Sequence, residues 1–170
     1  MRSSTFTFAA PDGFSLFVYR WLPDKAPKAA VQVAHGLAEH SGRYARLAGA
    51  LTRAGYAVYG ADHRGHGRTA RVPEDLGFFA EREGWRKCVD DLWHLHNRIA
   101  ADHSGLPLLL IGHSMGSFMA QQFISEHGRG LAGAVLSGSG GRPLRLTGAV
   151  RLLARMERLR LGGRGKSALM

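Results

Sequence analysis

The amino-acid sequence predicts an α/β fold, in which a mostly parallel sheet carries helices on both faces and begins with an antiparallel hairpin. Short apolar runs alternate with longer segments of helical periodicity, which is the pattern of parallel strands joined by crossover helices. The first two short runs follow each other with no helical segment between them. Those two runs therefore predict the hairpin, and the later ones predict the parallel strands.

The strands are predicted from short runs of suitable length and composition. We expect the hairpin at about residues 4–9 and 14–21, and further strands at 29–34, 56–60, 107–112 and 131–137. The run at 108–111 is entirely apolar and is too short for a helix. The last run, Leu131 to Leu136, would leave an apolar sheet edge with unpaired backbone groups if the sheet ended there.

Helices are expected at 41–54, 81–103 and 114–127, where apolar residues recur every three or four positions. Helix 81–103 places Trp85 and Cys88 on its apolar side. We therefore interpret Cys88 as a small buried core residue and not as a nucleophile. It is the only cysteine, so an intrachain disulfide is excluded.

Composition sets the class of protein. A hydrophobic fraction of 45% over 170 residues is typical of a globular chain with one core. The N-terminus lacks the apolar core of a signal peptide, and no apolar stretch reaches the length of a membrane span. These features predict a cytoplasmic protein.

The positive charge is concentrated at the C-terminal end. Of the net charge of +10, residues 142–170 carry +7. We therefore divide the chain into an α/β core, 1–141, and the start of a basic amphipathic cap or lid segment, 142–170. Because the core is only weakly basic, no nucleic-acid partner is expected.

Residues 147–160 of the basic segment predict an amphipathic, arginine-rich helix. It has three interpretations. A cap helix over the substrate entrance is favoured. A helix that lies on a membrane surface, in peripheral contact with lipid, is the second. A nucleic-acid contact is the third.

A serine motif follows the apolar run at 108–111. Gly112, His113, Ser114, Met115 and Gly116 match G-x-S-x-G, between an expected strand and an expected helix. That context is typical of a nucleophile elbow, a sharp turn that holds the serine hydroxyl exposed at its tip. The two glycines allow strand and helix to come close together.

Two further loop segments accompany the serine motif. After the strand 29–34, His35 and Gly36 introduce a loop that can aim the backbone N–H of Leu37 at a developing oxyanion, with the N–H of Met115 as second donor. The alternative is a simple glycine turn before the next helix.

After the strand near residue 59 comes the second segment, Asp62-His63-Arg64-Gly65-His66-Gly67-Arg68-Thr69. We interpret it as structural, and a metal pair of His63 and His66 is disfavoured because spacing supplies no third ligand.

The segments HGLAEHSGRY, DHRGHGRT and GHSMGS, in this order, resemble the α/β-hydrolase superfamily, and within it the monoacylglycerol lipase and lysophospholipase-like group of serine aminopeptidase S33-like hydrolases. The resemblance covers residues 5–136. It implies a serine hydrolase of carboxylic esters, with Ser114 as nucleophile and Leu37 and Met115 as oxyanion donors. His35, Gly36, Asp62, Gly112, His113 and Gly116 support the site. No metal or organic cofactor is implied. Members often carry small residues where Leu37 and Ala38 stand, so the acyl pocket is expected to differ.

The acid and the histidine of the triad should follow the serine along the chain. The only histidine after Ser114 is His127, at the far end of the serine's helix. We therefore expect the chain to be the N-terminal part of a longer hydrolase, ending within its cap, and to be inactive alone. An upstream histidine could orient the oxyanion loop, or could act as a substitute base. An inactive or binding-only relative and an S33-type aminopeptidase are the alternative functions.

Overall fold

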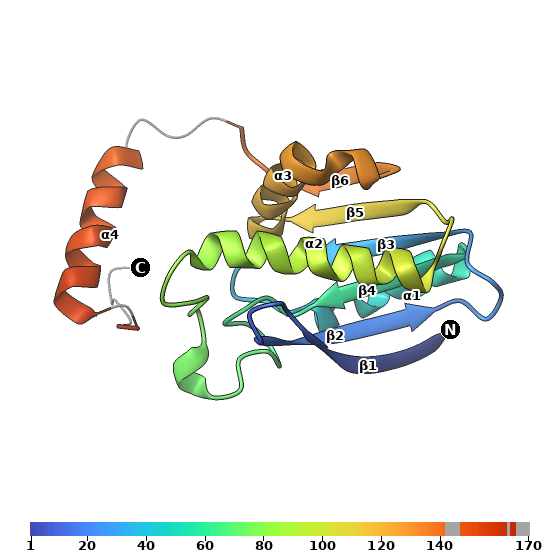
Figure 1. Ribbon diagram of the computed structural model, residues 1–170, viewed down its shortest axis with the longest axis horizontal. Coiled ribbons are helices and arrows are strands. Elements are labelled where there is room, and N and C mark those ends of the chain that lie inside the picture. The colour runs from blue at the N-terminus through green and yellow to red at the C-terminus, as the bar shows by residue number, and fades with distance from the viewer. Residues whose placement is uncertain (142–146, 163, 166–170) are drawn as a thin grey trace. The chain divides into compact units, whose positions relative to one another are not determined.

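The computed structural model describes residues 1–141, 147–162 and 164–165, so the first residues of the predicted cap segment, 142–146, lie outside the described residues. The chain forms two compact units, Met1–Ser139 and Gly140–Met170. The first unit is a six-stranded sheet flanked by helices (Figure 1). The second contains a single described helix, α4, Thr147–Leu161.

The sheet has the strand order β1-β2-β4-β3-β5-β6. β1 pairs with β2, and β2 with β4, in antiparallel orientation, whereas the β4–β3, β3–β5 and β5–β6 pairs are parallel. The predicted hairpin and parallel core are therefore confirmed. The strands are β1 (Arg2–Ala9), β2 (Ser15–Leu22), β3 (Ala29–Ala34), β4 (Tyr56–Ala61), β5 (Leu108–His113) and β6 (Gly133–Ser137).

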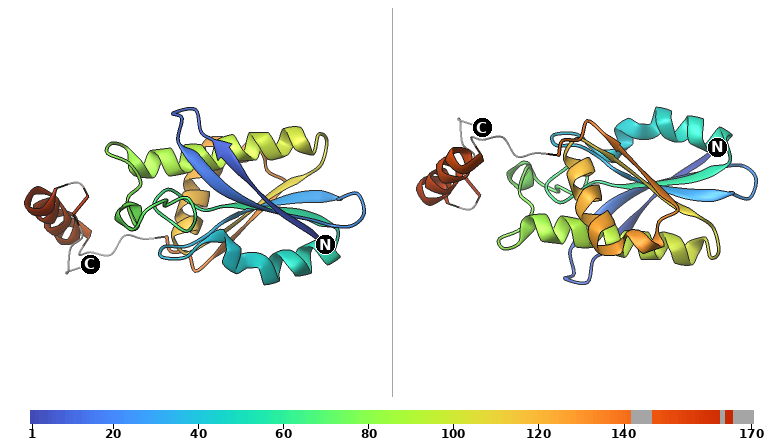
Figure 2. Two further views of the ribbon diagram at one scale, coloured as in Figure 1. Left: turned by 90° about the horizontal axis from the view of Figure 1, so that it is seen from below. Right: turned by 90° about the horizontal axis from the view of Figure 1, so that it is seen from above.

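Helices cover both faces of the sheet, as Figure 2 shows: α1 (Ala45–Arg53) lies on one face, and α2 (Gly84–Asp102) and α3 (Met115–His127) lie on the other. Alternate residues of a strand point to opposite faces. Accordingly, Val31 and Val33 pack with Ala48 of α1, while Ala34 packs with the apolar side chains of α2 and α3. Cys88 of α2 is fully buried among the apolar side chains that pack with Ala34, as predicted.

Two helix predictions were wrong at their N-terminal ends. The segment 41–54 is a 3₁₀ turn, Ser41–Tyr44, followed by α1, because Ser41 is tied through its hydroxyl to the carbonyl of Ala61 at 2.7 Å. α2 begins at Gly84 and not at residue 81, because Glu83 has a left-handed backbone with φ of 55°. Trp85 is not a core residue: it is 38% exposed, and its indole N–H donates to Gln122 at 2.7 Å.

The expected apolar edge is present. β6 lies at the end of the strand order and pairs only with β5 within the described residues. Val135 and Leu136 are 55% and 40% exposed. What matters most for the site is that β3, β5 and β6 all end at the same side of the sheet, because the carboxyl ends of parallel strands meet at one edge.

Candidate active site

Ser114 lies at a sharp turn between β5 and α3. Its φ of 50° and ψ of −117° form a strained backbone conformation for a residue with a side chain. Its N–H donates to the carbonyl of Ser137 at 2.8 Å, and its own carbonyl accepts from the Ser117 hydroxyl at 2.6 Å. The end of β6 and the first turn of α3 therefore hold the strained residue in place, with its side chain partly exposed.

The glycines on either side of Ser114 have the steric role that the sequence predicts. A Cβ atom at Gly112 would lie 2.5 Å from the carbonyl oxygen of Gly116. A Cβ atom at Gly116 would overlap the carbonyl of Ala34 and lie 2.5 Å from that of His35. The start of α3 can therefore approach the end of β3 only when residue 116 has no side chain.

The loop after β3 lies directly against the serine. A Cβ atom at Gly36 would be 3.2 Å from Cβ of Ser114 and 3.4 Å from the ring of His113. The next residue, Leu37, has a side chain that is 64% exposed. Among the described residues, neither the N–H of Leu37 nor that of Met115 donates a hydrogen bond. Both N–H groups are therefore free to donate to a ligand beside Ser114.

Three histidines form a buried cluster behind this loop. The ring centroids of His35 and His63 are 4.1 Å apart, and those of His35 and His66 are 5.3 Å apart. Burial lowers the pKa of His35 to about 4 and that of His63 well below its usual value, so both rings are neutral at pH 7. Within the described part of the chain, no histidine is hydrogen-bonded to the Ser114 hydroxyl.

His127 lies at the opposite end of α3 from Ser114, as its sequence position predicts. Its ring stacks on that of Trp93, with centroids 4.0 Å apart. A residue at that end of the helix is too far along it to exchange a proton with Ser114. Within the described residues, Ser114 therefore has a partly exposed side chain beside a loop whose Leu37 N–H donates no hydrogen bond, and no histidine is hydrogen-bonded to the serine hydroxyl.

Asp62 joins the loop that follows β4 to the start of the 3₁₀ turn after β3. Its buried carboxylate accepts the N–H groups of Ser41 and Arg68, each at 2.7 Å. Gly67, with φ of 49°, packs against the same carboxylate, which leaves no room for a side chain there. Burial raises the pKa of Asp62. Its contacts are those of a residue that fixes two loops.

Arg64 anchors the turn between β1 and β2 to α2. No local sequence pattern predicted this contact. Its guanidinium is 3% exposed and donates to Asp91 of α2 at 2.7 and 2.9 Å, and to Asp12 at 2.8 and 2.9 Å. Arg64 holds the pKa of Asp12 well below its usual range, whereas burial raises that of Asp91. The guanidinium also stacks over the ring of Phe14, 4.3 Å from its centroid.

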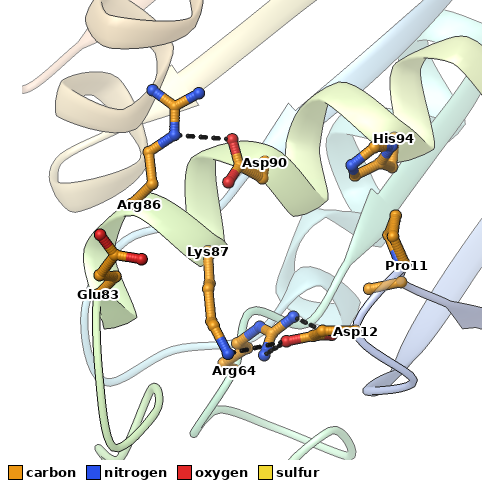
Figure 3. Close-up of a pocket in the computed structure, with 9 residues that line it drawn as sticks. Pro11, Asp12, Arg64, Glu83, Arg86, Lys87, Asp90 and His94 are labelled. Carbon is orange, nitrogen blue, oxygen red and sulfur yellow. Dashed lines mark hydrogen bonds and ion pairs between the residues drawn. The ribbon is translucent and has the colours of Figure 1, made fainter.

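A charged cavity of about 180 Å³ lies beside this anchor (Figure 3). Its lining includes Asp12, Arg64, Glu83, Arg86, Lys87 and His94. Lys87 pairs with Asp12 at 3.1 Å and Arg86 pairs with Asp90 at 2.9 Å, so the charges of the wall largely compensate one another. No residue of the serine turn or of the oxyanion loop lines it.

We expect Arg64→Met to lower the free energy of unfolding by about 3–5 kcal/mol, because it leaves Asp91 buried without its counter-charge. Arg86→Met is the matched control: Arg86 lines the same cavity but is 47% exposed, so its loss should destabilise the chain much less than the loss of Arg64. Urea unfolding followed by circular dichroism measures both. Equal losses in the two variants would show that Arg64 is not the anchor.

No group of three or more His, Cys, Asp or Glu side chains among the described residues is arranged to hold a metal ion. No helix among those residues combines the length and the apolarity that a bilayer span requires.

Comparison with known proteins places the chain in context. The sequence matches the family described as serine aminopeptidase, S33, over residues 25–161. It is 36% identical over 135 residues to the monoacylglycerol lipase of Mycolicibacterium smegmatis, covering 79% of this chain and 46% of that protein. It is 38% identical over 128 residues to human monoglyceride lipase, covering 74% of this chain and 39% of that one.

Solved structures agree in fold. A thermostable carboxyl esterase from Bacillus coagulans, in complex with glycerol, superposes with a TM-score of 0.80 at 32% identity, covering 96% of this chain and 52% of that one. A monoglyceride lipase variant from Saccharomyces cerevisiae superposes with a TM-score of 0.70 at 21% identity, covering 94% of this chain and 51% of that one. The chain thus spans about half the length of these proteins, and less than half that of the curated relatives.

Proposed function

Because the chain belongs to the serine aminopeptidase S33 family of α/β hydrolases, we propose that it provides the nucleophile and the oxyanion site of a serine hydrolase that cleaves carboxylic esters. The observation that carries the proposal is the strained Ser114, which lies against the loop after β3, together with the N–H groups of Leu37 and Met115, which donate to no described residue. Monoacylglycerol lipases and a carboxyl esterase among its relatives favour a monoacylglycerol ester as substrate, and the resemblance of its motifs to lysophospholipases adds a lysophospholipid ester as the alternative.

In this mechanism the hydroxyl oxygen of Ser114 attacks the carbonyl carbon of the ester, and the carbonyl oxygen becomes an oxyanion. The N–H groups of Leu37 and Met115 donate to that oxyanion, and each such donor contributes about 2.7–4 kcal/mol to transition-state stabilisation. Collapse of the tetrahedral intermediate expels the alcohol and leaves an acyl-serine. Water then releases the acid and restores the serine.

A base must take the serine proton and return it to the leaving alcohol. We propose that a histidine and its acid partner come from residues beyond the 170 given, since the chain spans only about half of the Mycolicibacterium lipase and of the Bacillus esterase, and His127 is remote from the serine. On this proposal the 170-residue chain alone has negligible turnover. The intact mass of the protein isolated from its source cells tests this: a mass of 18.5 kDa would contradict it.

Two other functions remain as alternatives, each with its own support. The family description favours an aminopeptidase, and the missing base favours an inactive or binding-only relative. A fluorophosphonate probe and a substrate panel separate the three. Labelling at Ser114 with hydrolysis of monoacylglycerol esters supports the proposal. Hydrolysis of alanine or proline anilides instead indicates a peptidase, and neither labelling nor turnover in the native protein indicates a binding protein.

We also propose that α4 contacts lipid surfaces. Three exposed arginines, Arg151, Arg155 and Arg158, share one side of the helix. Leu152, Met156 and Leu159 occupy the adjacent side and are 60%, 58% and 87% exposed. A basic stripe next to an apolar one is typical of helices that lie in the interface of an anionic membrane.

Changing Arg151, Arg155 and Arg158 of α4 to glutamine should weaken binding to vesicles of phosphatidylglycerol by more than about tenfold, because each cation near such a surface contributes about 1 kcal/mol. Vesicle sedimentation measures the change. Changing Lys25, Arg46 and Arg53, which are exposed in the other unit, removes the same charge and should have little effect. An equal loss in both triple variants would indicate general charge attraction without a role for α4.

A further inference from the structure

We propose that His35 and Glu39 are positioning residues that fix the two peptide groups flanking Gly36, and thereby aim the N–H of Leu37 at the carbonyl under attack. The inference rests on the proposed function, since it assigns a role to residues behind the same oxyanion site. Both residues belong to the loop that follows β3, and among the described residues neither side chain is hydrogen-bonded to Ser114.

The peptide between Gly36 and Leu37 is held from its carbonyl end. Nδ1 of His35 donates to the carbonyl oxygen of Gly36 at 2.7 Å. In a planar trans peptide the C=O and N–H bonds point in opposite directions. Anchoring the Gly36 oxygen to the buried ring therefore directs the Leu37 N–H away from the core. A rotation that withdrew this donor would break the bond to His35.

The direction of that bond depends on the tautomer of His35, and a neighbouring loop fixes it. The backbone N–H of His63 donates to Nε2 of His35 at 2.9 Å, so Nε2 must be unprotonated. Burial lowers the pKa of His35 to about 4, so the neutral ring carries its only proton on Nδ1. His66 and His40 oppose a positive charge on this ring and Glu39 favours one, but burial dominates.

The preceding peptide is held by Glu39. Its carboxylate accepts the N–H of Gly36 through a short hydrogen bond and the hydroxyl of Tyr44 at 2.7 Å. Arg43 lies 3.5 Å from the second carboxylate oxygen. These hydrogen bonds and the nearby charge of Arg43 outweigh burial, so the pKa of Glu39 is lowered and the group stays ionised at neutral pH. Ala38, with φ of 57°, makes the turn that brings Glu39 back beneath Gly36.

The two bonds give the oxyanion loop a single orientation before substrate arrives. Electrostatic catalysis depends on donors that need no reorientation during the reaction. The arrangement also connects the two loop motifs: the loop after β4 supplies the His63 N–H, which sets the tautomer of the histidine in the loop after β3. Loss of the orientation should reduce kcat, with little change in KM, because the bond to the oxyanion forms only in the transition state.

Two substitutions at His35 separate positioning from stability. In His35→Asn the amide can occupy the place of Nδ1 and still donate to Gly36, but the His63 N–H loses its acceptor. In His35→Gln the amide oxygen can occupy the place of Nε2 and keep the bond from His63, but the donor to Gly36 is lost. We expect kcat of the native protein for a short-chain ester to fall about 10²-fold in His35→Gln, with KM within threefold of wild type, and less than tenfold in His35→Asn.

Thermal unfolding gives the complementary readout. A purely structural role would make the loss of activity follow the loss of stability in the two variants. Equal losses of kcat, or losses confined to KM, would overturn the proposal. Glu39→Gln, which keeps an acceptor for Gly36, should retain more kcat than Glu39→Ala; the reverse order would count against the role of Glu39.

A measurement on the wild-type chain remains decisive if the variants fail to fold. ¹⁵N NMR of the His35 ring at pH 7 should show a protonated Nδ1 and an unprotonated Nε2. The opposite tautomer, or a doubly protonated ring, would overturn the positioning role whatever the activity. Absence of ester hydrolysis in the native protein, together with the expected tautomer, would contradict the proposed function while leaving the loop geometry supported.

Discussion

Replacing Ser114 with alanine in the native protein is expected to abolish ester hydrolysis and fluorophosphonate labelling, with a loss of kcat of up to about 10⁶-fold. In the proposed mechanism, the substitution removes the oxygen that forms the acyl bond and leaves the backbone as it is. Ser125→Ala is the matched control, because Ser125 is an exposed serine on the same helix. Labelling that persists in Ser114→Ala, or disappears in Ser125→Ala, would show that the nucleophile is another residue.

Glycine at the same position separates chemistry from strain. Ser114 makes no side-chain capping bond at the start of α3, so glycine there removes no stabilising hydrogen bond. It relieves the φ of 50°, which costs a residue with a side chain on the order of 1 kcal/mol. Ser114→Gly should therefore be inactive but more stable than Ser114→Ala. Urea unfolding of the two variants checks the order, and equal stability would mean that the backbone of this turn is not strained.

Most of the fold could be predicted because it is encoded locally. Each strand was expected to within two residues, since the apolar runs are short and lie between turns or helices. The errors arose where long-range contacts override local periodicity. The tie between Ser41 and the carbonyl of Ala61 turns the predicted start of α1 into a 3₁₀ turn, and the exposed Trp85 depends on a hydrogen bond to Gln122 on another helix.

The site was predictable in its backbone and less so in its supporting contacts. The turn at Ser114 and the close approach at Gly116 follow from the spacing of two glycines between a strand and a helix. The bond between His35 and the backbone of His63 joins residues 28 positions apart, and the Arg64–Asp12 pair joins residues 52 positions apart. No local pattern specifies such partners, because only the completed sheet brings them together.

Replacing Gly116 with alanine is expected to lower the free energy of unfolding by about 3 kcal/mol or more and to remove fluorophosphonate labelling as well. The new methyl group would overlap the backbone carbonyl of Ala34 in a central strand, which cannot move aside as a flexible side chain could. To relieve the clash, α3 must shift away from β3. That shift would carry the N–H of Met115 away from the oxyanion site.

Gly49→Ala is the control that distinguishes this clash from a general effect of losing glycine. Gly49 is buried within α1, and a Cβ atom there meets only the guanidinium of Arg53, at 3.6 Å. Alanine in a helix interior should therefore stabilise the chain by about 0.5–1 kcal/mol. Urea midpoints that move in opposite directions in the two variants would support the close approach of α3 to β3. A neutral Gly116→Ala would show that the turn can accept a side chain, and would remove the steric reason for its second glycine.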